Sequence, residues 1–233
     1  MKIAVINFSG NVGKSTVARH LLLPRVPGAE LIAIESLNAD EGQGQALRGR
    51  QFGELQEYLQ TVSSVVVDIG ASNVQELMAQ MQRYRGSHED FDAFVVPAVP
   101  ALKQQQDTIA TVIELNRLGV SASRLKLVFN MVDAGVTVAQ VFDPLLAFLK
   151  QKPIARVNLN CKLGANEIYG RIKGTKTDLS ALATDPTDYK ALIAQAKDTI
   201  EKLALARKLA TRRLASGVVP ELDVCFAALE FKP

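Results

Sequence analysis

The sequence predicts an α/β fold, a doubly wound and mostly parallel sheet with a helical C-terminal extension. Short apolar runs rich in Val and Ile alternate along the chain with longer stretches of helical period, which is typical of such sheets. The runs "SVVVDI" and "DAFVVPAV" are apolar at nearly every position, as expected of strands buried on both faces. With 233 residues, 48% hydrophobic and 22% charged, the chain can build a sizeable core.

The strands and helices are expected to alternate in chain order. The apolar runs predict strands at Ile3–Asn7, Leu31–Glu35, Ser64–Asp68, Ala93–Val96, Leu125–Asn130 and Ile154–Val157. The stretches between them predict helices at Lys14–Leu23, Gly53–Thr61, Val74–Tyr84, Lys103–Leu118 and Val138–Lys150. We therefore expect residues 1–175 to form one α/β domain.

Residues 176–233 are expected to form a basic helical extension and a tail that pack on the same domain. Asp185 and Pro186 have the residue types of a helix N-cap and first turn, and Gly217 is expected to end that helix. The last apolar piece, "ELDVCFAALEF", predicts an added strand or a tail that docks on a partner. A short helix is also expected near Asn166–Ile172.

Composition favours a cytoplasmic protein with no membrane association. No apolar run approaches the length of a membrane span, and the sequence begins directly with strand-like residues. The two cysteines, Cys161 and Cys225, fit a reducing compartment; they could pair, but two inert core thiols are the simpler interpretation. Two histidines without Cys or His neighbours argue against a structural zinc site.

The segment "VINFSGNVGKST" follows the first predicted strand and opens a helix, which is the context of a phosphate-binding loop. In such a loop backbone N–H groups and the helix dipole bind phosphate. Lys14 would reach the β- and γ-phosphates, Ser15 would ligate Mg²⁺ and Thr16 could bond the α-phosphate. The pattern G-x-x-x-x-G-K-[ST] fails at Phe8. The expected nucleotide-binding residues are Ser9, Gly10, Asn11, Val12, Gly13, Lys14, Ser15 and Thr16.

With its glycines close to the lysine, this loop resembles that of the ParA/MinD group of P-loop ATPases, K-G-G-x-G-K-[ST]. Aligned on Lys14, the chain has Ser9 at the position of the signature lysine and Asn11 in place of a glycine. The phrases "INFSGNVGKST" and "ARHLLLPR" are most similar to StbB-type plasmid-stability proteins. The resemblance covers roughly residues 1–175 and implies the P-loop NTPase topology of the group.

The resemblance also implies ATP or ADP with Mg²⁺ as ligands. "SSVVVDIGAS" resembles the strand whose final aspartate serves the metal, which assigns Asp68 to the Mg²⁺ shell. "LKLVFNMVD" resembles the strand whose terminal asparagine contacts adenine, which assigns Asn130 to the base. No guanine-reading N-K-x-D pattern follows Asn130, which favours ATP.

Hydrolysis is less clearly supported than binding. The group has a D-x-D pattern after its second strand, and here Glu35 stands at the first position but Leu37 at the second. Asp40 or Glu41 could substitute, so the expected catalytic residues are Lys14, Glu35, Asp40 and Asp68. In the group the signature lysine crosses a nucleotide-sandwich dimer. With Ser9 at that position, Lys103 or Arg19 could supply the cation, or catalysis is weakened.

Three functions remain open. The first is a ParA-like ATPase of plasmid stability, partition or conjugation that forms a nucleotide-dependent homodimer, contacts a plasmid-encoded DNA-binding partner and binds DNA nonspecifically. The second is a nucleotide-binding adaptor that hardly hydrolyses, and the third a metabolic P-loop enzyme. The basic segment "KLALARKLATRRLASG" is either a solvated face or a DNA-binding surface. Its candidate DNA-binding residues are Arg207, Lys208, Arg212 and Arg213.

Overall fold

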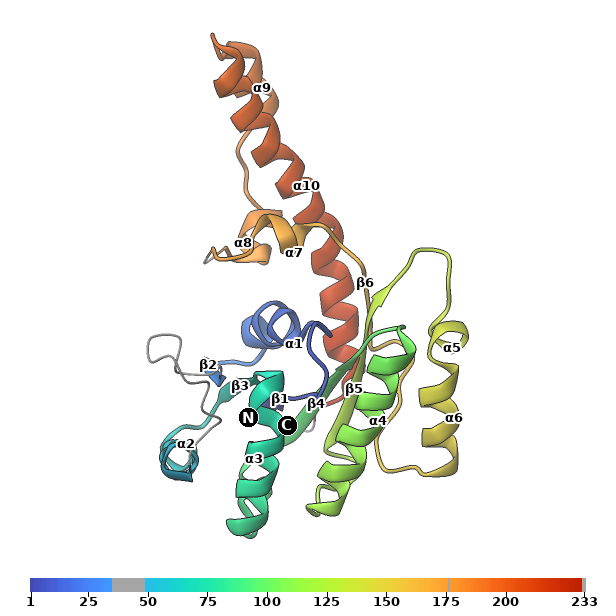
Figure 1. Ribbon diagram of the computed structural model, residues 1–233. Helices are drawn as coiled ribbons and strands as arrows, with labels where there is room; N and C mark the ends of the chain where they lie inside the picture. Colours follow the sequence, from blue (N-terminus) through green and yellow to red (C-terminus); the bar gives the residue numbers. More distant parts are fainter. Residues whose placement is uncertain (35–48, 176, 232–233) are drawn as a thin grey trace. The chain divides into compact units, whose positions relative to one another are not determined.

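The computed structural model describes residues 1–34, 49–175 and 177–231. Its larger unit is built on a parallel sheet with the strand order β2-β3-β1-β4-β5-β6 (Figure 1). The strands are β1 (Lys2–Val5), β2 (Glu30–Ile34), β3 (Val65–Ile69), β4 (Ala93–Ala98), β5 (Leu125–Val132) and β6 (Lys162–Gly164). The predicted α/β class with a parallel sheet is therefore confirmed.

The order of the strands places β1 at the centre of the sheet. Val5 pairs with Asp68 of β3 on one side and with Val95 of β4 on the other. The chain builds β2 and β3 on one side of β1 and then crosses to build β4, β5 and β6 on the other. In open α/β sheets ligands bind at the carboxyl ends of the strands where this reversal occurs. The residues that follow β1 therefore lie where a ligand site is expected.

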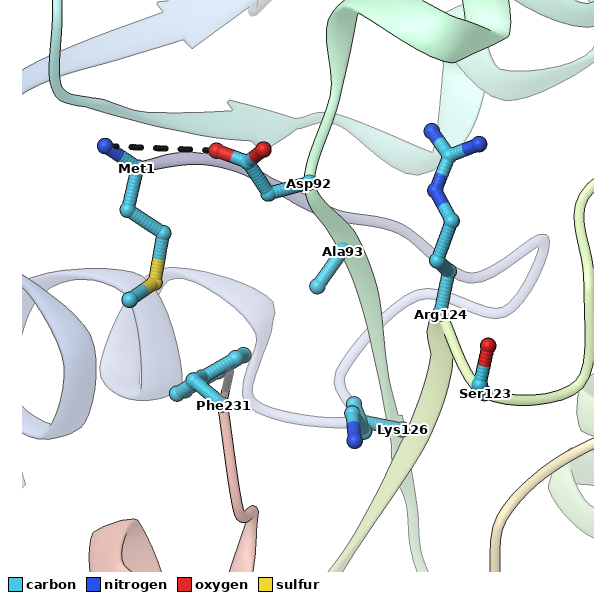
Figure 2. Close-up of a pocket in the computed structure, with 7 residues that line it drawn as sticks. All are labelled: Met1, Asp92, Ala93, Ser123, Arg124, Lys126 and Phe231. Carbon is cyan, nitrogen blue, oxygen red and sulfur yellow. Dashed lines mark ion pairs between the residues drawn. The ribbon is translucent and has the colours of Figure 1, made fainter. Parts of the chain in front are cut away.

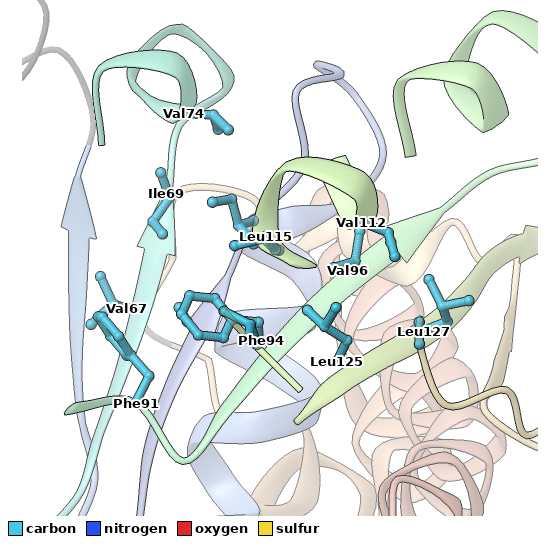
Figure 3. Packing of buried hydrophobic residues seen from close by; sticks show 14 of the residues in the cluster. Val67, Ile69, Val74, Phe91, Phe94, Val96, Val112, Leu115, Leu125 and Leu127 are labelled. Atoms are coloured by element: carbon cyan, nitrogen blue, oxygen red, sulfur yellow. The ribbon is translucent and has the colours of Figure 1, made fainter. Parts of the chain in front are cut away.

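One face of the sheet carries the main hydrophobic core. Phe94 and Val96 of β4 pack with Leu115 from the helix above them and with Leu125 of β5 (Figure 3). Every residue of β3 and β4 is buried, which explains their near-continuous apolar sequences. Between the strands of this unit lie the helices α2 (Gly49–Thr61), α3 (Ala71–Arg83), α4 (Leu102–Arg117), α5 (Val138–Val141) and α6 (Asp143–Gln151).

The helix expected at Lys14–Leu23 begins at its predicted residue but changes its winding. A first turn, α1 (Lys14–Thr16), continues as a π-helical segment over Val17–Leu22 and ends in a 3₁₀ turn at Leu23–Arg25. The apolar side chains of the π-helical segment, including Val17 and Leu21, are fully buried. The phosphate loop therefore runs into a helix that is fixed by the core.

Two predicted boundaries in the larger unit were wrong. Ile154–Val157 is not a strand; Arg156 makes only an isolated bridge to Lys126, and the sixth strand is the later segment β6. The helix expected at Val138–Lys150 is divided at Phe142 into α5 and α6. Pro144 in the first turn of α6 explains the division, because proline supplies no N–H to continue the preceding helix.

The chain divides into two compact units. The larger contains Met1–Gly164 together with the chain from Cys225 onward, and the smaller contains Ala165–Val224. The division thus falls after Gly164, whereas the sequence suggested a boundary at 175. The smaller unit contains the short helices α7 (Ile168–Arg171), α8 (Leu179–Ala183) and α9 (Tyr189–Gln195), and most of α10 (Thr199–Ala228). In the described part of the chain no helix is long and apolar enough to cross a membrane.

The long C-terminal helix differs from the one predicted. Two helices replace it because Asp188 caps α9 through the Ala191 amide and Asp198 accepts hydrogen bonds from the amides of Ile200 and Glu201. Helix α10 then passes through Gly217 and Pro220 without ending. A glycine in a helix weakens it without breaking it, so buried residues further along can carry the helix past that position.

The final apolar piece is the end of this helix, so the predicted added strand was wrong, whereas docking of this piece on a partner stays a prediction. Within the larger unit, Asn158 Nδ2 donates to the Ala228 carbonyl at 3.0 Å, and Lys126 Nζ to the Glu230 carbonyl at 3.3 Å. Leu229 is buried beside these bonds. Cys161 and Cys225 are both buried and form no disulfide, as expected of core thiols, and burial raises the pKa of Cys161 to about 11.

Candidate functional site

The loop between β1 and α1 has the backbone that its glycines predicted. Gly13, immediately before α1, is in the left-handed region at φ 86°, and a Cβ there would lie 2.2 Å from Asn130 Nδ2. Asn11 also has positive φ, at 57°. Asparagine tolerates this region better than other residues with a Cβ. Asn11 therefore adopts the left-handed conformation that a glycine takes most readily.

Lys14 lies inside this loop. Its Nζ donates to the Ser9 carbonyl at 2.6 Å and to the Asn7 carbonyl at 3.2 Å, and the residue is 7% exposed. Burial lowers the pKa of Lys14 from its ordinary value, and the charge of Asp68 opposes part of this shift. The ammonium is therefore held by carbonyl groups of the loop itself, and its predicted contact with the phosphates stays a prediction.

Asp68 is brought to the same end of the sheet. It lies in β3 beside Val5 and is 4% exposed. Ser15 is exposed in the first turn of the helix after the loop. A hydroxyl and a carboxylate oxygen are the donors that Mg²⁺ prefers, so this pair fits the predicted metal position. In the described ranges no three His, Cys, Asp or Glu residues cluster as metal ligands. A Mg²⁺ ion would therefore depend on phosphate oxygens and water as well.

Asn130 reaches the loop from the end of β5. Its Nδ2 donates to the Val12 carbonyl at 2.9 Å, and its Oδ1 accepts from the Met131 amide at 2.9 Å. The residue is 3% exposed and fills the space that a side chain at Gly13 would need. Both ends of the carboxamide are thus engaged, one with the loop and the other with β5. Its predicted contact with adenine stays a prediction, for which the carboxamide still has a second N–H and a second lone pair.

Several predicted residues lie elsewhere or outside the described ranges. Ser9, at the signature-lysine position, is buried in the loop, with 5% of its surface exposed. Arg19 is exposed on the helix after the loop, and Lys103 is exposed in the first turn of α4. Glu35 and Asp40, like Leu37 and Glu41, fall in the segment 35–48 that the structure does not describe.

The basic residues of α10 do not form one uniform exposed surface. Arg207, Lys208 and Arg213 are exposed. Arg212 is half-buried, and its Nη1 donates to the carbonyls of Asp185 at 3.0 Å and Thr187 at 2.6 Å. Its guanidinium also lies 5.2 Å from the centre of the Tyr189 ring. Arg212 therefore holds the turn before α9 to α10, and the exposed candidates for a polyanion are the other three.

Three residues that hold the loop were missed by the sequence analysis. Asn7 donates to the Pro97 carbonyl and to Thr108 Oγ1, both at 2.8 Å. Thr111 Oγ1 accepts a hydrogen bond from the Phe8 amide at 3.0 Å. Asn7, Thr108 and Thr111 are all fully buried. The only signal in the sequence was the presence of polar residues at positions of α4 that should face the sheet.

A pocket of about 180 Å³ lies at the other end of the sheet (Figure 2). Met1, Asp92 and Arg124, which line it, precede β1, β4 and β5, whereas the phosphate loop follows β1. Arg124 donates to the carbonyls of His88 and Phe91, so its guanidinium is already used by the protein. The pocket therefore does not belong to the candidate site.

Comparison with known proteins shows the fold. No family model matches the sequence, and no curated protein matches it. Apo McdA from Cyanothece superposes with a TM-score of 0.52 at 13% identity, covering 98% of this chain and 97% of that one. A McdA variant in complex with ATP gives 0.48 at 16% identity, covering 96% of both chains.

A putative plasmid partition protein from Borrelia burgdorferi, bound to AMPPNP, gives a TM-score of 0.46 at 14% identity, covering 76% of this chain and 91% of that one. Agreement over almost the whole length with McdA matches the fold that the loop and strand order had suggested. The chain therefore has the α/β fold of the ParA-type ATPases that its sequence resembles.

Proposed function

We propose that this protein is a ParA-like nucleotide-binding protein that takes ATP or ADP with Mg²⁺ at the loop between β1 and α1. The observation that carries the proposal is the position of Lys14, buried within the loop and electrostatically coupled to Asp68. A lysine held among backbone groups at a helix N-terminus is the arrangement that binds polyphosphate. The complexes of McdA with ATP and of the partition protein with AMPPNP are consistent with this ligand.

Each residue of the site would have its own role in binding the nucleotide. Lys14 and the loop amides from Gly10 to Ser15 would hold the phosphates, Ser15 and Asp68 would hold Mg²⁺, and Asn130 would approach the base. When bound, Mg²⁺ would neutralise phosphate charge. Because Asp68 is buried and Ser15 is exposed, the carboxylate has a fixed position, whereas the hydroxyl is open to an incoming ligand.

We further propose that the nucleotide state switches dimerisation and contacts with a plasmid-encoded DNA-binding partner, in plasmid stability, partition or conjugation. Nonspecific DNA would bind the exposed cations Arg207, Lys208 and Arg213. Such contacts are made to phosphates, so retention should fall steeply with salt. Reversal of Arg213 to Glu should weaken DNA retention in a gel shift, whereas loss of Arg212 should first destabilise the turn that it holds.

A second function, a nucleotide-binding adaptor that hardly hydrolyses, is favoured by Ser9. This residue is buried at the position where the ParA/MinD pattern has its lysine, and it carries no charge. An added cation at a phosphoryl-transfer site contributes on the order of 10³-fold or more in rate. Unless Lys103 or Arg19 of a partner copy enters the site, we expect slow turnover through Glu35 or Asp40.

Binding and turnover are tested separately. Wild-type protein should bind a fluorescent ATP analogue in the presence of Mg²⁺, and Lys14→Ala should reduce the affinity by about one to two orders of magnitude, the effect of losing a charged hydrogen bond at a buried site. Lys150→Ala, an exposed lysine of α6, is the matched control. Phosphate release with and without DNA then separates the two functions. Turnover abolished by Lys14→Ala supports the ATPase, and tight binding without turnover supports the adaptor.

A further inference from the structure

Helix α4 presents a polar stripe to the sheet that it covers. The stripe consists of Gln105, Thr108 and Thr111, which are spaced three residues apart and are at most 2% exposed. Residues at this spacing share one face of a helix, and that face is normally apolar where it packs on a sheet. Buried polar groups are costly unless they are hydrogen-bonded, so their partners indicate what the stripe does.

In each threonine of the stripe, the hydroxyl oxygen accepts a hydrogen bond from a residue of the phosphate loop. Thr111 Oγ1 donates to the Asp107 carbonyl at 2.7 Å and accepts from the Phe8 amide at 3.0 Å. Thr108 Oγ1 donates to the Gln104 carbonyl at 2.8 Å. A hydroxyl has one proton, and the short bonds to their own helix use it, so both threonines serve mainly as acceptors toward the loop; Thr111 Oγ1 also lies 3.5 Å from Asn7 Oδ1, a longer and weaker contact.

Asn7 connects the stripe to the loop interior. Its Nδ2 donates to Thr108 Oγ1 at 2.8 Å, and its Oδ1 accepts from the Ser9 amide at 2.8 Å. The carbonyl of Ser9 is in turn the acceptor for Lys14 Nζ. The path from α4 to the lysine is therefore a continuous series of hydrogen bonds through buried groups.

The stripe is itself fixed at its first residue. Gln105 Nε2 donates to the carbonyls of Pro100 at 2.7 Å and Val141 at 2.8 Å. These bonds hold the start of α4 to the end of β4 and to α5. The threonines therefore stand on a helix whose own position is determined, and a rigid helix can set the position of the loop.

We propose that Thr111 and Asn7 are positioning residues for the phosphate loop: they hold its first turn in the shape that receives the nucleotide phosphates. The proposal rests on the proposed nucleotide-binding function. Backbone N–H groups bind phosphate well only when the loop is already in the binding shape, because otherwise binding must also order the loop. The residues act through the backbone of Phe8 and Ser9 and do not touch the ligand themselves.

The test compares threonine variants of equal shape. Thr111→Val removes the acceptor for the Phe8 amide and keeps the volume, whereas Thr111→Ser keeps the hydroxyl. Thr211→Val is the matched control. Thr211 Oγ1 also donates to the carbonyl four residues earlier, that of Arg207, at 2.8 Å, but it accepts no hydrogen bond from the phosphate loop. Three quantities are measured on each variant: hydrogen exchange of the loop amides in the nucleotide-free protein, affinity for a fluorescent ATP analogue, and thermal stability.

Thr111→Val should speed amide exchange at Phe8 and Ser9 and weaken nucleotide binding about tenfold, the effect of one lost buried hydrogen bond. Thr111→Ser should restore both within about twofold, and Thr211→Val should change neither. A merely structural role would lower thermal stability and leave the affinity of the folded protein and the loop exchange unchanged, and that result would overturn the proposal.

Failure of the proposed function and failure of the positioning role would give different results. If the wild-type protein binds no nucleotide, the proposed function is wrong, and exchange in the nucleotide-free protein still decides whether Thr111 holds the loop. If wild type binds and Thr111→Val binds equally well, the positioning role is wrong and the nucleotide site stands.

Discussion

Replacing Gly13 by alanine gives the sharpest test of the loop geometry. The glycine is at φ 86°, and the added Cβ would lie 2.2 Å from Asn130 Nδ2, well inside any permitted contact. Asn130 must then move, which breaks its 2.9 Å bonds to the Val12 carbonyl and the Met131 amide. Gly13→Ala therefore combines a backbone penalty with the loss of a buried side-chain network.

The magnitude follows from these two parts. An alanine in the left-handed region costs about 1 kcal/mol. Each broken hydrogen bond costs about 1 kcal/mol more. The free energy of unfolding should therefore fall by about 3 kcal/mol in total. Because small domains are stable by roughly 5–15 kcal/mol, the variant should still fold. Its affinity for nucleotide should fall as well, because the displaced Asn130 no longer supports the loop.

The assay is urea denaturation of a double-mutant cycle with Asn130→Ala. In the Asn130→Ala background the clash is absent, so Gly13→Ala should cost only the backbone part, about 1 kcal/mol, and the coupling should be about 2 kcal/mol. Gly10→Ala is the control in the same loop, because a Cβ there meets nothing within 4 Å and it should cost little. A penalty for Gly13→Ala that does not change in the Asn130→Ala background would refute the reasoning.

Three further predictions concern the rest of the molecule. Gly217→Ala should stabilise α10 by about 0.5–1 kcal/mol in urea denaturation, since the site is helical and an added Cβ meets nothing within 4 Å; a loss of stability would contradict it. Hydrogen bonds from Thr187 and Tyr189 lower the pKa of Asp185 from 3.8 to about 2, so its contribution to stability is complete above pH 4 and is lost between pH 4 and 2. The melting temperature of Asp185→Asn should therefore fall less steeply over that range than wild type, and parallel profiles would exclude this role. Asn130→Ala should weaken binding of ATP and of inorganic triphosphate about equally if the residue supports the loop, and of ATP alone if it contacts the base, as competition titrations with both ligands would show.

Features that depend on neighbouring residues could be predicted from the sequence. The strands β3 and β4 were recognised because residues buried on both faces are apolar at successive positions. The phosphate loop was recognised because its glycines and Lys14 stand between a strand and a helix, and Asp68 because it ends a strand. The same reasoning failed for the sixth strand, where β6 is too short to have a pattern of its own.

The tertiary structure decided what depends on distant contacts. Helix α10 passes Gly217 because side chains beyond it, such as Val218 and Leu222, are buried, and Arg212 is not part of the exposed basic surface because it donates to the turn before α9. The bond from the Phe8 amide to Thr111 joins residues 103 positions apart. The sequence by itself determined the sheet and the loop, because the burial of a strand and the conformation of the loop both depend on residues that are consecutive in the chain. The support of that loop by α4 was decided only by the tertiary structure. The residues around a buried threonine in the sequence do not indicate its distant hydrogen-bond partner.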